Sequence, residues 1–332
     1  MSRLGSVFFT SVEPKRSHIM QKHTSHTVLL FLFAAAIGDA ARIPPNWLNA
    51  VVAIGHMAPN PTTRTPEWAT VGSGFFYGYL VQDDPDPTKR EYEVYLITNR
   101  HVVANQAQVE IRLNPKKASD QGEVFSIPMF DQATGRPTWF NHRDADVDIA
   151  GARVNWEFLK NRGIDDEFFC SDTNAADTAK MKDIGVAAGD GIFVLGFPMN
   201  LAGKQRNYVI VRPGAIARVT DLIESAATKL MIDSHVFPGN SGGPVILEPS
   251  MMAISGTKSN NTAYLLGIAT DFIPYIDVAI SPQTQRARVT FEENSGLAEV
   301  IPVDRINEAI RAWRDSLPAN PRAPLKPAPG KP

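Results

Sequence analysis

Residues 235–245 read His-Val-Phe-Pro-Gly-Asn-Ser-Gly-Gly-Pro-Val and place a single hydroxyl, that of Ser241, among glycines. Gly239, Gly242 and Gly243 permit a tight turn that presents one side chain outward and leaves backbone N–H groups bare. The N–H groups of Gly239 and Ser241 can then point at one place and hold a developing oxyanion. The alternative interpretation of this stretch is a glycine-rich β-turn with an incidental serine.

Two further candidate residues lie upstream, each beside an apolar run. His101 follows Leu96-Ile-Thr-Asn-Arg, and an imidazole with an ordinary pKa of ~6.5 can accept a hydroxyl proton near neutrality. Asp148 opens the run Ile-Ala-Gly-Ala-Arg-Val, with Asp144 and Asp146 as rival acids. Taken alone, the histidine and the acid are each better explained as an ordinary surface or turn residue. Their order with Ser241 is nevertheless that of a triad in which serine attacks, histidine moves the proton and aspartate orients the imidazole.

The rest of the chain consists mainly of short runs rich in Val, Ile, Phe and Tyr, separated by turn residues. The runs are Ala50–Ile54, Gly72–Val81, Tyr92–Thr98, Val109–Leu113, Val147–Val154, Gly191–Gly196, Tyr208–Val211, Gly214–Val219, Lys229–Ile232, Val245–Leu247, Tyr264–Thr270 and Arg288–Phe291. Few helical patterns lie between them, which predicts an all-β sandwich or a pair of barrels. One amphipathic helix is expected near the end, because apolar residues recur at helical spacing from Ile306 to Trp313, with Asp304 placed to cap it.

Together these motifs resemble the trypsin-like serine peptidases, and most closely their bacterial, disulfide-free branch akin to the Deg (high-temperature-requirement) proteases. The matching blocks follow the order that the family requires: Gly72-Ser-Gly-Phe75, Thr98-Asn-Arg-His101, Asp148-Ile-Ala150, Gly196-Phe-Pro198, Gly239-Asn-Ser-Gly-Gly-Pro244, Gly267-Ile268, Asn294-Ser-Gly-Leu-Ala298 and Val300-Ile-Pro302. The resemblance runs from about Trp47 to Trp313, and the block that contains Ser241 is its most specific part.

The resemblance implies an all-β fold of two six-stranded antiparallel β-barrels, the chymotrypsin-like double barrel, with a C-terminal helix. We expect the N-terminal barrel to carry His101 and Asp148 and the C-terminal barrel to carry Ser241. The expected boundaries are 1–41 for an N-terminal extension and signal peptide, 42–165 for the N-terminal barrel, 166–190 for the connection, 191–302 for the C-terminal barrel, 303–316 for the helix and 317–332 for a disordered, proline-rich tail.

Carried over position by position, the resemblance makes Ser241 the nucleophile and His101 the general base and later acid. Asp148 would orient His101, and the N–H groups of Gly239 and Ser241 would form the oxyanion hole. This predicts a serine endopeptidase that cleaves polypeptide substrates through an acyl-enzyme, with no cofactor and no metal ion. Two alternatives stay open: a catalytically silent binding or sensing protein of the same fold, and an esterase that uses the same triad.

The primary specificity pocket is expected to differ from that of trypsins. His235, six residues before Ser241, falls at the base of the pocket, where trypsins have Asp. A preference for Arg or Lys is therefore disfavoured, and His235 either binds an acidic side chain or fills the pocket. The stretch Gly267-Ile268-Ala269 is expected to contact the substrate as well.

Two other departures from the family pattern concern regulation. Asn240 stands where activation by a freed N-terminus needs an acid, so we expect an enzyme that is active without such clipping. Only 19 residues follow Trp313, whereas a domain usually needs at least ~50, so no PDZ domain is expected.

The composition narrows the function classes further. A formal charge of −2, from 33 Lys+Arg against 35 Asp+Glu, offers no basic stripe for nucleic acid. An apolar fraction of 43% excludes intrinsic disorder for most of the chain. Cys170 is the single cysteine of the sequence, so it can form no internal disulfide and the fold must be held by packing.

The segment Met20–Ala41 has the pattern of a secretory signal peptide. Lys22 precedes an apolar run over 28–37, followed by small residues at Gly38 and Ala40. This run of ten residues is too short to span a bilayer, which needs ~20. We therefore expect a secreted or periplasmic protein with no stable membrane span after signal removal, the alternative being a buried N-terminal helix. The sequence leaves the oligomeric state open.

Overall fold

The computed structural model describes residues 42–60, 62–165, 167–250 and 254–317. The predicted signal peptide and the proline-rich segment from residue 318 onward lie outside these described residues. None of the described helices is long and apolar enough to cross a membrane.

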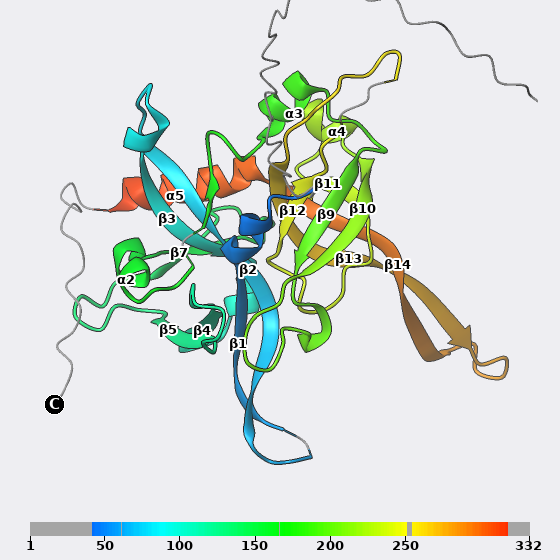
Figure 1. Ribbon diagram of the computed structural model, residues 1–332. Helices are drawn as coiled ribbons and strands as arrows, with labels where there is room; N and C mark the ends of the chain where they lie inside the picture. Colours follow the sequence, from blue (N-terminus) through cyan, green and yellow to red (C-terminus); the bar gives the residue numbers. More distant parts are fainter. Residues whose placement is uncertain (1–41, 61, 166, 251–253, 318–332) are drawn as a thin grey trace, which may run out of the picture. The chain divides into compact units, whose positions relative to one another are not determined.

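The N-terminal half of the fold is one sheet of eight strands (Figure 1). Its strands are β1 (Val51–Pro59), β2 (Pro66–Gln82), β3 (Glu91–Thr98), β4 (Gln108–Leu113), β5 (Glu123–Pro128), β6 (Trp139–Asn141), β7 (Ala150–Arg153) and β8 (Phe169–Cys170). Neighbouring strands follow the order β5-β4-β1-β2-β3-β7-β6, and all of these pairs are antiparallel. The short strand β8 pairs in parallel with β2.

The N-terminal sheet differs in detail from the expected closed six-stranded barrel, because its described strands form an open path from β5 to β6. Beyond β5 and before β6, the two ends meet in one isolated antiparallel bridge between Phe130 and Pro137. The N–H of Thr138 donates to the Met129 carbonyl at 2.9 Å, and the N–H of Asp131 donates to the Arg136 carbonyl at 2.8 Å. A single bridge, rather than a ladder between β5 and β6, therefore joins the ends of this sheet.

The C-terminal half is a closed antiparallel barrel of six strands in the order β10-β11-β14-β13-β12-β9. The strands are β9 (Gly191–Gly196), β10 (Ile210–Arg218), β11 (Leu230–Asp233), β12 (Pro244–Leu247), β13 (Tyr264–Ile280) and β14 (Ala287–Pro302). The predicted all-β, chymotrypsin-like fold is thus confirmed, with a half-open first sheet and a closed second barrel.

Helices are short apart from the last one. They are η1 (Pro45–Ala50), α1 (Arg100–Val103), η2 (Pro87–Lys89), α2 (Trp156–Asn161), α3 (Thr178–Ile184), η3 (Pro198–Asn200), α4 (Thr220–Ile223) and α5 (Val303–Ser316). Asp304 does not cap α5 as expected, because Pro302 holds the N-cap position and no side chain caps it. The Asp304 carboxylate instead accepts hydrogen bonds from the N–H and hydroxyl of Thr178 in α3.

The described part of the predicted connection, residues 167–190, contains secondary structure of its own. Phe169–Cys170 forms strand β8 against β2, and Asp177 caps α3 by accepting a hydrogen bond from the N–H of Lys180. Helix α3 ends at Gly185, whose φ of +80° is the left-handed conformation typical of a helix C-terminus.

Alternation along the strands explains why the N-terminal sheet is buried on both faces. On β2, Phe75 and Tyr77 belong to the core between the two halves, whereas Phe76 belongs to the core on the opposite face. On β9 of the barrel, Ile192 and Val194 point into the barrel and Leu195 points out toward the N-terminal sheet. Successive side chains of a strand face opposite sides, so continuous apolar runs serve two cores at once.

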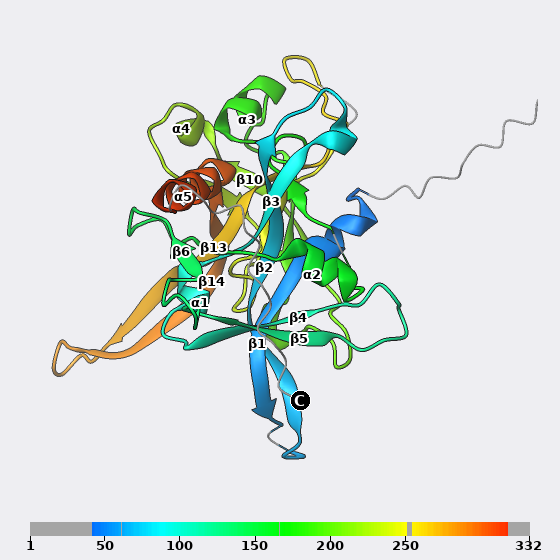
Figure 2. The ribbon, with the colours of Figure 1, turned by 90° about the vertical axis from the view of Figure 1, so that its left-hand side faces the viewer.

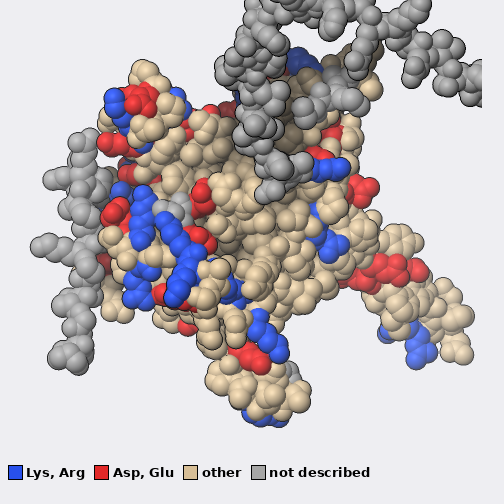
Figure 3. Space-filling model, viewed as in Figure 1, with Lys and Arg blue, Asp and Glu red and all other residues tan. Residues whose placement is uncertain are grey.

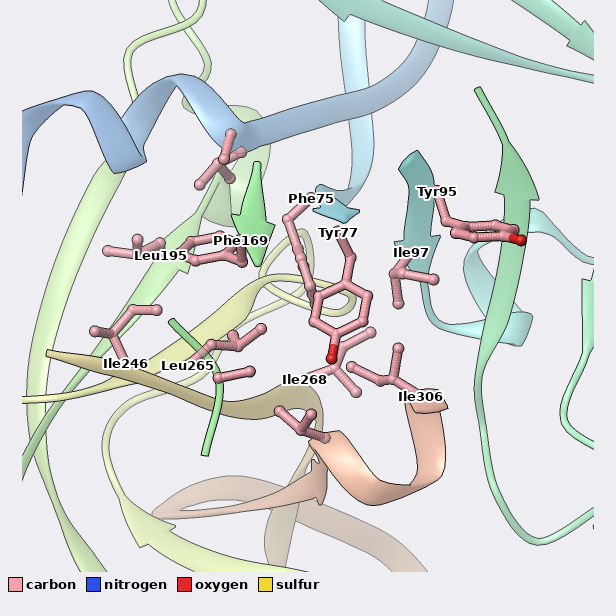
Figure 4. Close-up of a cluster of buried hydrophobic side chains, with 14 of the residues drawn as sticks. Phe75, Tyr77, Tyr95, Ile97, Phe169, Leu195, Ile246, Leu265, Ile268 and Ile306 are labelled. Atoms are coloured by element: carbon pink, nitrogen blue, oxygen red, sulfur yellow. The ribbon is translucent and has the colours of Figure 1, made fainter. Parts of the chain in front are cut away.

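Helix α5 also contributes side chains to the core between the two halves. Tyr77, Ile268 and Ile306, from β2, β13 and α5, are fully buried and lie together in Figure 4. Tyr77 also donates a hydrogen bond from its hydroxyl to Asn307 Oδ1 at 2.9 Å, and Trp313 stacks on Phe140 with ring centroids 5.5 Å apart. Figure 2 shows α5 end-on beside the sheets that it joins.

We predict that Ile306→Ala destabilises the whole domain, because it removes a fully buried side chain that contacts both halves. The free energy of unfolding should fall by about 2–5 kcal/mol in a urea titration. Arg311→Ala on the exposed side of α5 is the matched control and should leave the midpoint unchanged. Equal midpoints for the two variants would contradict the role given to α5.

Candidate active site

His101 lies just beyond the end of β3, in the single turn of α1. Asn99, the N-cap of that turn, is fully buried and donates a hydrogen bond from Nδ2 to the backbone carbonyl of Asp148 at 2.8 Å. Arg100 donates a hydrogen bond to the carbonyl of Ala145. The residues on both sides of His101 therefore attach its turn to the loop that precedes β7.

Asp148 makes two contacts with His101. Its Oδ2 lies 2.5 Å from His101 Nδ1, and its Oδ1 accepts a hydrogen bond from the His101 backbone N–H at 3.1 Å. Of the rival acids, Asp144 accepts the backbone N–H of Asp146 through Oδ1. The structure thus brings Asp148, of the three candidate acids, against the His101 ring.

This contact changes the proton affinity of both groups. The hydrogen bond to Asp148 is the main reason why the pKa of His101 is raised above its ordinary value, with burial of the ring opposing it and the charges of Asp148 and Asp271 adding to it. Burial by itself would raise the pKa of Asp148, but the hydrogen bond and charge of His101 outweigh it and lower that pKa below its ordinary value. The pair therefore favours an imidazolium held beside a carboxylate.

Ser241 lies on the loop between β11 and β12, and two glycines of this loop adopt backbone conformations that other residues avoid. Gly239 has φ +100° and Gly242 has φ +88°. A Cβ at Gly242 would lie 2.0 Å from the Ser73 carbonyl oxygen, and one at Gly239 would lie 2.4 Å from the Phe197 carbonyl oxygen. The loop is therefore pressed against neighbouring backbone on both sides of Ser241.

Ser73 of β2 holds this loop against the N-terminal sheet. Its backbone N–H donates to the Ser241 carbonyl at 2.8 Å, and its hydroxyl donates to the Gly239 carbonyl at 2.6 Å. The same hydroxyl accepts the N–H of Phe197 at 3.0 Å, while the Ser73 carbonyl accepts the Thr98 hydroxyl at 2.7 Å. Ser73 is fully buried, so these bonds are shielded from water.

A second loop, residues 197–207, supports the Ser241 loop from the other side. The N–H of Met199 donates to the carbonyl of Pro238 at 2.7 Å. Met199 and Asn200 both have positive φ, +53° and +60°, and Asn200 Oδ1 accepts the N–H of Thr70 at 2.6 Å. Two adjacent left-handed residues that are not glycine persist only where their surroundings hold them in place.

Arg112 of β4 fastens that second loop. Its guanidinium is buried, donates to Asn207 Oδ1 and to the carbonyl of Gly203 at 2.7 Å each, and lies over the ring of Trp68. Burial lowers the pKa of Arg112 to about 10. No carboxylate pairs with it among the described residues, so backbone carbonyls and an amide supply its acceptors.

The backbone N–H groups of Gly239 and Ser241 differ from those of the residues around them. Within the described residues neither donates to a protein acceptor, although their neighbours Asn240, Gly242 and Gly243 all do. Among the residues that the structure describes, no hydrogen bond joins the Ser241 hydroxyl to the His101 ring. In unliganded enzymes, such contacts are often long and tighten only when substrate binds.

His235 is exposed and lies near Gly296 of β14. A Cβ built on Gly296 would lie 3.7 Å from His235 Cε1, an ordinary van der Waals contact, so the two residues are close neighbours. The ring also stacks on Phe237 with centroids 6.4 Å apart, and Arg212 covers the Phe237 ring. The expectation that His235 forms the base of a specificity pocket stays a prediction.

The stretch Gly267–Ala269 is packed into the fold, and its expected contact with the substrate stays a prediction. All three residues are buried in β13, and Ile268 is part of the core between the halves. Ala269 uses its N–H and carbonyl for Gly243 and Gly242. The next exposed residue of the strand is Asp271, whose charge helps to raise the pKa of His101. The sequence did not point to Asp271, because the sequence does not show which residues of β13 face His101.

A metal centre has no basis in the described residues, where no group of three or more His, Cys, Asp or Glu side chains could hold an ion. Cys170, in β8, is half-buried, and burial raises the pKa of its thiol. Its strand pairs with β2 at Gly78, and in the described residues no hydrogen bond links Cys170 to His101, Asp148 or Ser241.

Comparison with known families agrees with this geometry. A family model described as the trypsin-like peptidase domain matches residues 72–249, more than half of the chain. The chain belongs to the trypsin-like peptidase family. The matched range contains His101, Asp148 and Ser241 together with Ser73 and the loop of residues 197–207.

Two further comparisons place this trypsin-like peptidase beside known proteins. Among solved structures it is similar to the apo crystal structure of the MamO protease domain from Magnetospirillum magneticum, with a TM-score of 0.40 and 16% identity over 79% of this chain and 96% of that one. A comparison with curated proteins found no match.

We predict that Ser73→Ala destabilises this peptidase domain, because the variant leaves the Gly239 carbonyl and the Phe197 N–H without their buried partner. The free energy of unfolding in urea should fall by about 1–3 kcal/mol. Ser119→Ala, which removes an exposed hydroxyl, is the control and should change nothing measurable. A Ser73→Ala variant as stable as that control would mean that the hydroxyl does not hold the loop.

Proposed function

We propose that this trypsin-like peptidase is a serine endopeptidase that hydrolyses peptide bonds through an acyl-enzyme on Ser241. The observation that carries the proposal is the 2.5 Å contact between His101 Nδ1 and Asp148 Oδ2, in a domain whose Ser241 stands on a glycine turn. Asp148 leaves Nε2 of the imidazole as the nitrogen that accepts a proton.

In the proposed reaction, His101 removes the hydroxyl proton as Ser241 Oγ attacks the carbonyl carbon of the scissile bond. The N–H groups of Gly239 and Ser241, which have no protein acceptor in the described chain, supply donors for the oxyanion. His101 then protonates the leaving amine, and a water activated by the same ring releases the acid product and restores Ser241.

We propose that the site is competent without an N-terminal ion pair. Asn240 is uncharged and buried, so it offers no acid for such a pair. Support for the loop comes instead from Ser73 on one side and from the segment that Arg112 fastens on the other. Both supports are built into the domain itself.

We also propose that the protein is exported and acts as a secreted or periplasmic enzyme. This rests on the apolar run of residues 28–37 and the small residues after it. Polypeptides outside the cytoplasm would then be its substrates, with His235 facing the side chain that precedes the cleaved bond.

We predict that a fluorophosphonate probe labels the folded wild-type chain, because the probe reacts only with an activated serine. Labelling should vanish in Ser241→Ala and fall by about 10⁶ in rate in His101→Ala. Ser119→Ala and His56→Ala change the same residue types at exposed positions and should label like wild type. Labelled residues are identified by mass spectrometry of tryptic peptides.

Cleavage of a peptide library, mapped by mass spectrometry, separates peptidase from esterase activity in the same preparations. Labelling at Ser241 with ester turnover alone would reject the endopeptidase. Absence of labelling in folded wild type would reject catalysis and leave a binding protein.

We predict that kcat/KM rises with pH, and that the midpoint of this rise lies above the ordinary pKa of histidine. His101 must be neutral to accept the serine proton, and Asp148 raises the pKa of His101, so activity is lost as pH falls through that raised value. Asp148→Asn removes the main cause, and the midpoint should move to lower pH while kcat falls by about 10⁴. A midpoint that stays in place in Asp148→Asn would contradict this assignment.

A further inference from the structure

β13 and β14 continue past the barrel as a two-stranded ribbon, residues 274–294, which we call the arm. The barrel pairings end before it, since β12 pairs with β13 only up to Ile268 and β11 pairs with β14 only from Leu297 onward. The arm projects away from the barrel in the view of Figure 1 and also in the view of Figure 2. In the described chain, its two strands pair only with each other.

The arm carries a concentration of exposed apolar side chains. Its large apolar residues are between 42% and 60% exposed: Tyr275, Ile276, Val278, Ile280, Val289 and Phe291. An isolated two-stranded hairpin is only marginally stable in water, and an exposed apolar patch on such a hairpin marks a surface that binds a partner. The open edges of both strands add unpaired backbone groups to this surface.

The strand register divides the arm into two faces with different charges. The Val278 face consists of Ile276, Val278 and Ile280 on β13 and of Ala287, Thr290 and Glu292 on β14, because Ile276 pairs with Glu292, Val278 with Thr290 and Ile280 with Ala287. The register shifts between Ala279 and Ile280, so Arg288 is the extra residue between Ala287 and Val289. The opposite face carries the acids Asp277 and Glu293 beside Val289 and Phe291.

Opposite charges lie on the two sides of Thr290 along β14. Arg288 lies two residues toward the tip from Thr290, and Glu292 lies two residues toward the barrel. Figure 3 shows the same polarity for the arm as a whole, with acidic atoms near the barrel and basic atoms toward the tip. A two-fold axis across the strands at Val278 and Thr290 would set each Arg288 against Glu292 of a second copy.

We propose that two copies of this chain associate through their Val278 faces, related by that two-fold axis. Val278 then meets Val278 of the second copy, Ile276 meets Ile280, and two Arg288–Glu292 pairs close the ends. Such an isologous contact is the commonest form of symmetric dimer. The opposite face, whose charges are both negative, cannot complement itself in this way. The association does not depend on the proposed peptidase activity.

The test is sedimentation velocity of the full chain over a range of concentrations. Wild type should reach twice the chain mass, and Val278→Lys should raise the dissociation constant at least about a hundredfold, because it places two like charges at the axis. Val289→Lys puts the same charge on the same arm but on the opposite face, and it should dimerise like wild type. Thermal unfolding followed by circular dichroism checks that both variants are folded.

A charge exchange tests the orientation. Arg288→Glu and Glu292→Arg should each be mainly monomeric alone, should form a heterodimer when mixed, and should restore the homodimer when combined in one chain. A wild type that stays monomeric, or a dimer lost equally in Val278→Lys and Val289→Lys, would overturn the proposal. Failure of the mixed variants to associate would overturn the two-fold arrangement.

Discussion

Ser73 connects the sheet that carries His101 to the loop that carries Ser241. Its N–H, hydroxyl and carbonyl each bond a different partner, and Gly242 approaches its carbonyl so closely that no side chain fits there. Because all of these groups are buried, shifting one half against the other would leave several unpaired. The relative placement of His101 and Ser241 therefore depends on a network centred on a residue that has no part in the proposed chemistry.

The apolar core between the halves gives this network its rigidity. Side chains from β2, β3, β9, β13 and α5 meet in one cluster, so the N-terminal sheet can remain open and still be covered on its inner face. The chain has one cysteine and forms no disulfide with it. Packing, the Ser73 bonds and the buried Arg112 do the work that cross-links do in small secreted domains.

Residues that position the site are spread more widely than residues that contact a substrate. Arg112 reaches the Ser241 loop through the segment that contains Met199, and Asn99 reaches His101 through the backbone of Asp148. The same long strand, β13, runs from the core at Ile268 past Asp271 and out into the arm. A single strand thus serves the fold, the edge of the site and the surface proposed for self-association.

The sequence alone determined the all-β class and the glycine turn around Ser241, because these depend on local patterns and short motifs. It made His101 a candidate only through the order of His101, Asp148 and Ser241 along the chain. The resemblance to the family pattern pointed to Asp148 rather than Asp144 or Asp146, and the tertiary structure supplies the contact itself, with Asp148 Oδ2 2.5 Å from His101 Nδ1. The tertiary structure also moved Ile268 into the core and showed Ser73 and Arg112 as supports. Contacts between segments far apart along the chain leave no periodicity in sequence, and only folding brings them together.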